Sequence, residues 1–423
     1  MRKIIFFAQL ALFFAGVFLA GCATAPMARP QPSPEPKVLA EFDFSLADRL
    51  ILLPVKFRGE EYRFALDTAA NRTVFDLSLR DKLGWRLPIR KRAQAAQGTT
   101  VAVEAFLAPR AYVGPLSLED CGHIAVLDLN PVSTAVGKKV HGIIGTDFLK
   151  EYAVQIDFDN SKVRFFESKT RLDILWFLRP ETNEHPEWGE PLPIKFRFLE
   201  DLPFVRGRVP DNIAEDFLID TADNTFGGTL QAKIFNRVCK DIEATTKTDM
   251  ITTAAGKVPT RFKKATIVEK FSIGQFEYRG VGFYDGYEST LGLGFLSRHL
   301  VTFDFPNKRM YLKKGKTYER PPFILATLEI LGFTIRPTPE AVVVESVEPN
   351  SPAEHKGIRP DDVLLRIDDH DLGSYTLGEL IEFICQLHNE EHEVITFSFR
   401  RGDDIKQISF GKGDVVSEEN GTD

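Results

Sequence analysis

The chain has 423 residues, and 43% of them are hydrophobic, which is enough for ordinary packed cores in two to four domains. Its 60 acidic and 53 basic residues give a net charge of −7, spread without long runs of either sign. A nucleic-acid-binding surface needs a concentrated basic face, so the sequence predicts no nucleic-acid partner.

The N-terminus has the pattern of an export signal. Two basic residues precede an apolar run over 4–19, which is short for a bilayer span of about 20 residues but suits a signal-peptide core. The run ends in Leu-Ala-Gly-Cys at 19–22, which resembles the bacterial lipobox. In that family of signals a peptidase cleaves before the Cys and the thiol is acylated. We therefore expect 1–21 to be removed and Cys22 to carry the lipid; an ordinary signal peptide with an incidental Cys is the alternative.

A Pro-rich segment over 22–40 follows the lipobox and cannot form a packed core. In extended polyproline geometry of about 3.1 Å per residue it would hold the folded body roughly 40 to 50 Å from the bilayer. Ala23 after the Cys is what lipoprotein signals associate with outer-membrane sorting. The expected location is the cell envelope of a bacterium, lipid-anchored on the periplasmic side of the outer membrane.

The chain contains an internal repeat. Residues 148–160 align without gaps with residues 295–307, and in each copy an alternating strand ends in Asp157 or Asp304 and then turn residues. Such a pattern is typical of a β-hairpin, so we interpret these two Asp residues as structural.

A second matched element lies upstream of each copy. Residues 64–71, Phe-Ala-Leu-Asp-Thr-Ala-Ala-Asn, correspond to residues 217–224, Phe-Leu-Ile-Asp-Thr-Ala-Asp-Asn. Each is an apolar strand that runs into Asp-Thr-Ala and polar turn residues. The sequence therefore predicts two related β-rich units, over 41–168 and 190–315.

These elements resemble the retropepsin and pepsin families of aspartic proteases, in which an apolar strand ends in Asp-Thr-Gly and a later element reads hydrophobic-hydrophobic-Gly. The later elements here are residues 143–145, Ile-Ile-Gly, and residues 290–292, Thr-Leu-Gly. The resemblance implies an all-β, two-lobed, acid-protease-like fold in which one chain supplies both catalytic carboxylates, Asp67 and Asp220.

Both motifs depart from the family in the same way, with Ala69 and Ala222 where Gly is usual. Ala keeps the N–H that can donate to the Asp carboxylate and adds one methyl group, which can displace the carboxylate slightly. A change shared by both lobes favours a matched pair over decay. A catalytically weak or inactive peptide-binding scaffold is the alternative.

The chemistry that the resemblance implies is peptide hydrolysis by an activated water. Two carboxyl groups about 3 Å apart cannot both ionise, so one acts as base and the other donates a hydrogen bond to the scissile carbonyl. Thr68 and Thr221 resemble the family's Thr residues, whose hydroxyls bond across to the opposite loop and fix the distance. No cofactor and no metal are expected.

Three further features of the sequence have a possible functional role. Residues 95–98 and 254–256 resemble the tips of flap hairpins that close on an extended substrate. Residues 388–392, His-Asn-Glu-Glu-His, match a zinc-protease pattern but fall where a helix gives way to a strand, which favours a solvated helix end. Of the remaining cysteines, Cys121 and Cys239 would link the two units if bonded; free buried thiols are the favoured interpretation for these two and Cys385.

Residues 323–412 resemble a PDZ domain, a small α+β fold. Leu331-Gly332-Phe333 matches the loop whose N–H groups hold a peptide's C-terminal carboxylate, and residues 347–364 follow the bacterial PDZ pattern. A helix from Leu377 would form the other wall of the groove. The expected partners are peptide or protein substrates, protein C-termini and the membrane; a PDZ domain used only for packing is the alternative.

Overall fold

The structure of the protein is a computed structural model. It describes residues 36–45, 48, 50–94, 100–168, 185–197, 201–225, 227–238, 245–247, 250–253, 256–259, 263–268, 270–279, 281–316, 318, 331–337, 341–372 and 394–411.

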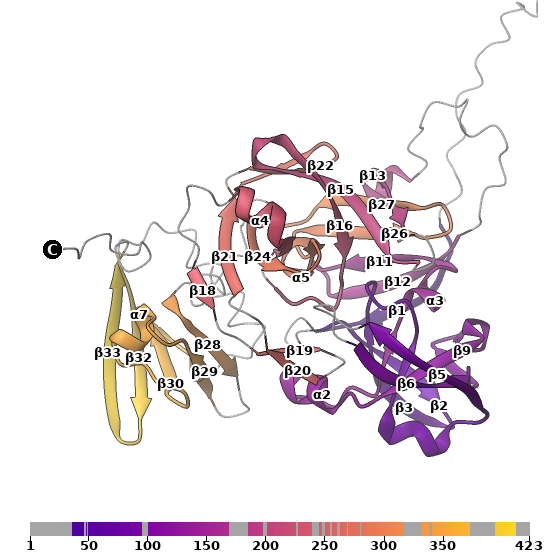
Figure 1. The fold of residues 1–423 in the computed structure, drawn as a ribbon, viewed down its shortest axis with the longest axis horizontal. Helices are drawn as coiled ribbons and strands as arrows, with labels where there is room; N and C mark the ends of the chain where they lie inside the picture. Colours follow the sequence, from indigo (N-terminus) through magenta and orange to yellow (C-terminus); the bar gives the residue numbers. More distant parts are fainter. Residues whose placement is uncertain are drawn as a thin grey trace, which may run out of the picture. The chain divides into compact units, whose positions relative to one another are not determined.

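A six-stranded antiparallel sheet joins the two repeat units (Figure 1). Its central strands, β11 and β26, pair with Gln155 opposite Thr302. These two residues are also equivalent in the sequence repeat, so a pseudo-two-fold axis passes between them. In order, the strands are β1 (Val38–Asp43), β12 (Lys162–Glu167), β11 (Tyr152–Asp157), β26 (His299–Asp304), β27 (Arg309–Lys314) and β13 (Glu190–Pro193).

Lobe 1, which contains β1 to β12, has a nine-stranded sheet. Its strands run in the order β5 (Arg86–Gln94), β6 (Thr100–Leu107), β9 (His123–Leu127), β4 (Val74–Asp76), β10 (Gly142–Ile144), β3 (Glu60–Leu66), β2 (Leu52–Phe57), β7 (Ala111–Val113) and β8 (Leu116–Ser117).

Lobe 2, which contains β13 to β27, repeats this arrangement strand for strand. The order is β18 (Thr245–Lys247), β21 (Lys263–Val268), β24 (Val281–Gly286), β17 (Gly228–Gln231), β25 (Thr290–Leu291), β16 (Ile213–Ile219), β15 (Pro203–Val209), β22 (Phe271–Ile273) and β23 (Phe276–Tyr278), with β14 (Lys195–Phe196) paired to β15. In both lobes the strand before the Asp lies parallel to its neighbour: β3 to β10, and β16 to β25.

The apolar ends of β3 and β16 explain why each Asp loop is held in the middle of a lobe. Phe64, Leu66, Phe217 and Ile219 are fully buried, as expected for strands covered on both faces. Edge-to-face aromatic contacts hold the two Phe residues, such as that of Phe64 with Phe75 at 4.9 Å between ring centroids.

The helices of the protease-like lobes are short. α3 (Thr146–Leu149) and α5 (Leu293–Leu296) follow β10 and β25, and α2 (Asn130–Val136) and α4 (Ala232–Val238) lie elsewhere in lobes 1 and 2. A two-stranded hairpin, β19 (Met250–Thr253) and β20 (Gly256–Pro259), lies between β18 and β21 in the chain. Within the described residues, no helix is long and apolar enough to cross a membrane.

The C-terminal part forms a separate small sheet with its own apolar cluster. It contains β28 (Phe333–Pro337), β29 (Val342–Val347), α7 (Pro352–His355), β30 (Val363–Ile367), β31 (His370–Asp371), β32 (Val394–Arg401) and β33 (Asp404–Gly411). The helix expected from Leu377 lies outside the described residues. The predicted fold class, a two-lobed all-β body followed by a PDZ domain, is confirmed.

Candidate active site

The two candidate catalytic residues occupy equivalent places, each directly after the central strand of its lobe. The backbone N–H of Asp67 donates to the carbonyl of Ile144 at 3.0 Å, and that of Asp220 donates to Leu291 at 3.0 Å. Each parallel neighbour strand therefore fixes the start of an Asp loop.

The Gly of each hydrophobic-hydrophobic-Gly element is required by close packing against these loops. A Cβ on Gly145 would lie 2.6 Å from the backbone carbon of Arg72, and one on Gly292 would lie 2.6 Å from the carbonyl oxygen of Asp223. Both neighbours are backbone atoms, which cannot move aside as a side chain can. The sequence pattern thus reflects a steric need of the site.

The two loops are tied together by Thr68 and Thr221, both buried. The Thr68 hydroxyl donates to the Ile219 carbonyl at 2.6 Å and accepts from the Thr221 N–H at 3.2 Å. The Thr221 hydroxyl donates to the Leu66 carbonyl at 2.8 Å and accepts from the Thr68 N–H at 3.0 Å. These four bonds cross between the lobes and hold the strand ends that carry Asp67 and Asp220 together.

The Ala residues that replace Gly donate backbone N–H groups to the carboxylates. Ala69 donates to Asp67 Oδ1 and Ala222 to Asp220 Oδ1, each at 2.8 Å. Both Asp residues are half-buried, so water can reach them. The methyl groups leave this donor geometry intact.

Burial raises the pKa of Asp67 to about 6, against the opposing effect of the Ala69 and Ala70 N–H groups. The pKa of Asp220 is also raised well above its ordinary range, first by burial and then by the negative charges of Asp67 and Asp223. A carboxyl pair perturbed in this way holds a proton at mildly acidic pH, which is the state that acid–base hydrolysis requires.

Two carboxylates behind the loops were not singled out from the sequence. In lobe 1, Asp147 accepts from the N–H and the hydroxyl of Thr73. In lobe 2, Asp223 accepts from the Thr225 N–H and the Thr290 hydroxyl, each at 2.9 Å. The signal that could have found Asp223 is a difference between the repeats, since Ala70 holds the equivalent position.

Several predicted features fall outside the described residues: Cys22, residues 95–98, 254 and 255, residues 388–392, Cys239 and Cys385. The strands flanking two of these gaps, β5 with β6 and β19 with β20, do form antiparallel hairpins. Cys121 is a buried free thiol, and burial raises its pKa to about 12. The described part of the chain contains no cluster of three potential metal ligands.

The predicted carboxylate-binding loop directly precedes β28. Leu331 and Phe333 are fully buried, and Gly332 adopts a φ of +85°. Its carbonyl accepts from the Glu348 N–H at 2.8 Å. Among the described strands, β28 pairs with β29.

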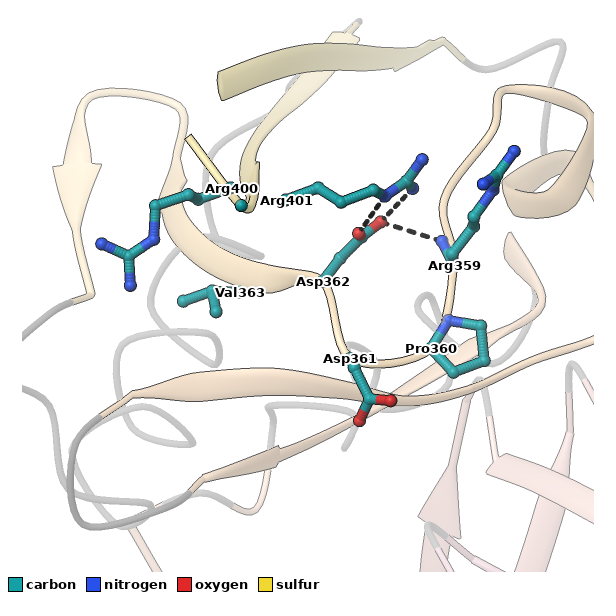
Figure 2. A pocket seen from close by; sticks show the side chains of 8 residues that line it. Arg359, Pro360, Asp361, Asp362, Val363, Arg400 and Arg401 are labelled. Carbon is teal, nitrogen blue, oxygen red and sulfur yellow. Dashed lines mark hydrogen bonds and ion pairs between the residues drawn. The ribbon is translucent and has the colours of Figure 1, made fainter. Parts of the chain in front are cut away.

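A depression of about 420 Å³ lies elsewhere in this domain, between the loop before β30 and the end of β32 (Figure 2). Asp362 points into an ion pair with Arg401 at 2.6 Å and accepts from the Arg359 N–H at 2.9 Å. Because the buried carboxylate and the guanidinium satisfy each other, we interpret this feature as structural.

A family model described as an aspartyl protease matches residues 53–148, and one described as a PDZ domain matches residues 343–401. Among solved structures, the chain is similar to the crystal structure of a retropepsin-like aspartic protease from Rickettsia conorii. The identity is 16% over 29% of this chain and 89% of that one, with a TM-score of 0.24. No curated protein matches the sequence. The chain thus contains an aspartyl-protease-like domain and a PDZ domain.

Proposed function

We propose that the protein is an aspartic endopeptidase in which Asp67 and Asp220 form one intramolecular catalytic pair. The observation that carries the proposal is the set of four reciprocal bonds made by Thr68 and Thr221. They join two Asp loops of equivalent structure, one from each lobe, within a single chain. An isolated strand-end turn would have no need of such a connection.

The pair would activate water without a metal or a covalent nucleophile. One carboxylate takes a proton from water as the water oxygen attacks the carbonyl carbon, and the protonated partner hydrogen-bonds the carbonyl oxygen. The Thr bonds matter because a displacement of about 1 Å can cost about a hundredfold in rate. The raised pKa of both carboxyl groups supports a pair that still keeps a proton at mildly acidic pH.

The decisive experiment is digestion of a peptide library by the mature protein at acidic and neutral pH. The same digestion is then repeated with the Asp67→Asn and Asp220→Asn variants. Each change should abolish cleavage, because an amide cannot take up the proton. Asp81→Asn, at a surface carboxylate whose side chain is 97% exposed, is the matched control and should keep full activity. Cleavage that survives either dyad change would remove these residues from the mechanism.

The second candidate function is an inactive peptide-binding scaffold, and Ala69 and Ala222 are the residues that favour it. Under this alternative, no peptide is cleaved from about pH 3 to about pH 8, even after Ala69→Gly and Ala222→Gly are combined. The PDZ domain would still bind C-terminal peptides through the edge of β28. Both results together would replace the enzyme with the scaffold.

We also propose a site of action, at the periplasmic face of the outer membrane, with lipidated Cys22 as the anchor. The lipobox-like residues 19–22 and the Pro-rich segment after them support this location. Cys22→Ser should stop incorporation of labelled lipid and leave precursor or soluble protein. Unchanged acylation in that variant would exclude Cys22 as the anchor.

A further inference from the structure

The surroundings of the two Asp loops differ systematically between the lobes, although the backbones match. The carbonyl of Ala70 accepts from the Thr146 N–H at 2.8 Å, and that of Asp223 accepts from the Leu293 N–H at 2.7 Å. Ala70 and Asp223 each stand three residues after the Asp of their loop. They are therefore the same structural position, filled by a methyl group in one lobe and by a carboxylate in the other.

The strands beside the loops show the same difference. Val74 lies opposite Ile143 between β4 and β10, and Thr229 lies opposite Thr290 at the matching place between β17 and β25. In lobe 1 the three positions are apolar, and Ala70 packs against the cluster that contains the other two. In lobe 2 all three positions are polar.

The polar residues of lobe 2 form one connected network. The carboxylate of Asp223 accepts from the Thr290 hydroxyl and from the N–H of Thr225. The Thr290 hydroxyl also accepts from the Thr229 N–H and contacts the Thr229 hydroxyl, both at 3.0 Å. The network therefore holds the carboxylate of Asp223 beside the Asp220 loop.

This charge acts on one member of the catalytic pair more than on the other. The Asp223 N–H donates to Asp220 Oδ1 at 3.0 Å, so the two residues share one tight turn. The negative charges that raise the pKa of Asp220 are those of Asp67 across the lobe boundary and of Asp223 in its own loop. On the lobe 1 side, Asp147 accepts hydrogen bonds from Thr73 and has Arg72 at 3.9 Å.

We propose that Asp223, held by Thr290, makes the catalytic pair unequal and keeps the shared proton on Asp220, so that Asp67 is the base. This inference rests on the proposed function. In the hydrolytic step Asp67 takes a proton from water while the water oxygen bonds to the carbonyl carbon. The proton of Asp220 passes to the carbonyl oxygen, which gives a neutral diol. Asp223 takes part in neither proton transfer and is a positioning residue that acts through Asp220.

The test is the pH profile of kcat/KM for Asp223→Asn, which keeps the shape of the side chain in the narrow space beside Gly292. Removing the charge makes loss of the Asp220 proton easier, so the alkaline limb should move to lower pH. Each unit of that movement changes the active fraction on the limb about tenfold. Asp216→Asn is the matched control, on the strand β16 that leads into the Asp220 loop. Its ion pairs are with Lys195 and Arg206, and its profile should equal that of the wild type.

A second readout separates this inference from the proposed function. Carboxyl carbon NMR of ¹³C-Asp protein, assigned with Asp67→Asn and Asp220→Asn, should show that Asp220 titrates at higher pH than Asp67, with a smaller gap in Asp223→Asn. Asp223→Ser gives the same comparison if the Asn variant does not fold. If the wild type cleaves peptides, and Asp223→Asn changes neither the limbs of the pH profile nor the difference in titration pH between Asp220 and Asp67, the role of Asp223 is overturned. The proposed enzymatic function is then unaffected. Absence of any Asp67-dependent cleavage would overturn the proposed enzymatic function. The difference in titration pH between Asp220 and Asp67 in the NMR measurement would still decide which residue carries the proton.

Discussion

The carboxylate of Asp147 accepts two hydrogen bonds from one residue, Thr73: the backbone N–H at 2.9 Å and the hydroxyl at 2.7 Å. Asp147 is buried, and burial raises its pKa above the ordinary range. Thr73 also places its hydroxyl 3.3 Å from the N–H of Gly145, which packs against the Asp67 loop. The contact therefore braces the back of the Asp67 loop in lobe 1.

Asp147→Ala should lower the free energy of unfolding by about 1–3 kcal/mol, because it leaves two buried donors of Thr73 without an acceptor. Asp147→Asn retains an acceptor oxygen of the same reach and should lose less than half as much. Urea unfolding of the two variants measures the difference. Equal losses would show that the charge of Asp147, and not its acceptor oxygen, matters for stability.

Thr68→Val and Thr221→Val should each reduce kcat strongly, by roughly tenfold to a hundredfold, because each removes a donor and an acceptor from the link between the loops. Thr68→Ser and Thr221→Ser keep the hydroxyl and should restore most of the activity. KM should change less than kcat, since these buried side chains are not available to substrate. A Val variant with wild-type kcat would mean that strand pairing alone holds the lobes in register.

The repeat in the sequence was sufficient to predict the two lobes, because each copy keeps both the apolar strand and the Asp-Thr-Ala turn. The cross-loop bonds of Thr68 and Thr221 were predicted from the resemblance to aspartic proteases, in which the hydroxyl of this Thr bonds to the opposite loop. The brace at Asp147 could not be predicted in this way. Gly294 stands at the equivalent position of lobe 2, so Asp147 has no repeated pattern, and its partner Thr73 is 74 residues away in the chain.

Asp223 illustrates a different limit. It lies inside the repeated motif, and the prediction of two lobes used the residues that the two copies share, whereas Asp223 is one at which they differ. Its importance depends on Thr290, which reaches it only because β25 runs beside β16. Differences between aligned repeats are therefore as informative as matches once the strand order is known.

The pair of Asp67 and Asp220 should make the protein less stable as the pH rises through the mildly acidic range. Burial raises the pKa of Asp67 from the ordinary 3.8 to about 6, so between these values the folded protein binds more protons than the unfolded chain. The contribution of Asp67 to the free energy of unfolding must then fall as pH rises across this window and level off above it. The pKa of Asp220 is raised as well, so Asp220 adds a fall of the same sign.

The measurement is urea unfolding of the wild type and of the Asp67→Asn, Asp220→Asn double variant across that window. His299, whose pKa burial lowers to about 3, contributes with the opposite sign in both proteins, so the difference between the curves isolates the pair. The double variant should gain stability relative to the wild type as pH increases. A constant difference would mean that the carboxyl groups are not buried as the structure has them.

Gly332→Ala should weaken binding of C-terminal peptides by the PDZ domain by more than about tenfold. A left-handed φ costs a residue other than Gly roughly 1–2 kcal/mol, and here a Cβ would also lie 2.1 Å from the Cβ of Ser351. The loop must therefore move, and with it the N–H groups that would hold the carboxylate.

Gly357→Ala is the matched control, because Gly357 has nearly the same φ of +81° but its Cβ would meet no described atom within 4 Å. Fluorescence anisotropy with labelled peptides on the full chain measures both affinities. The double variant Gly332→Ala, Ser351→Gly should recover part of the lost affinity, because it removes the steric conflict with the Cβ of Ser351 while the cost of the left-handed φ remains. Equal affinities for the Gly332 and Gly357 variants would show that the peptide carboxylate is not held by this loop.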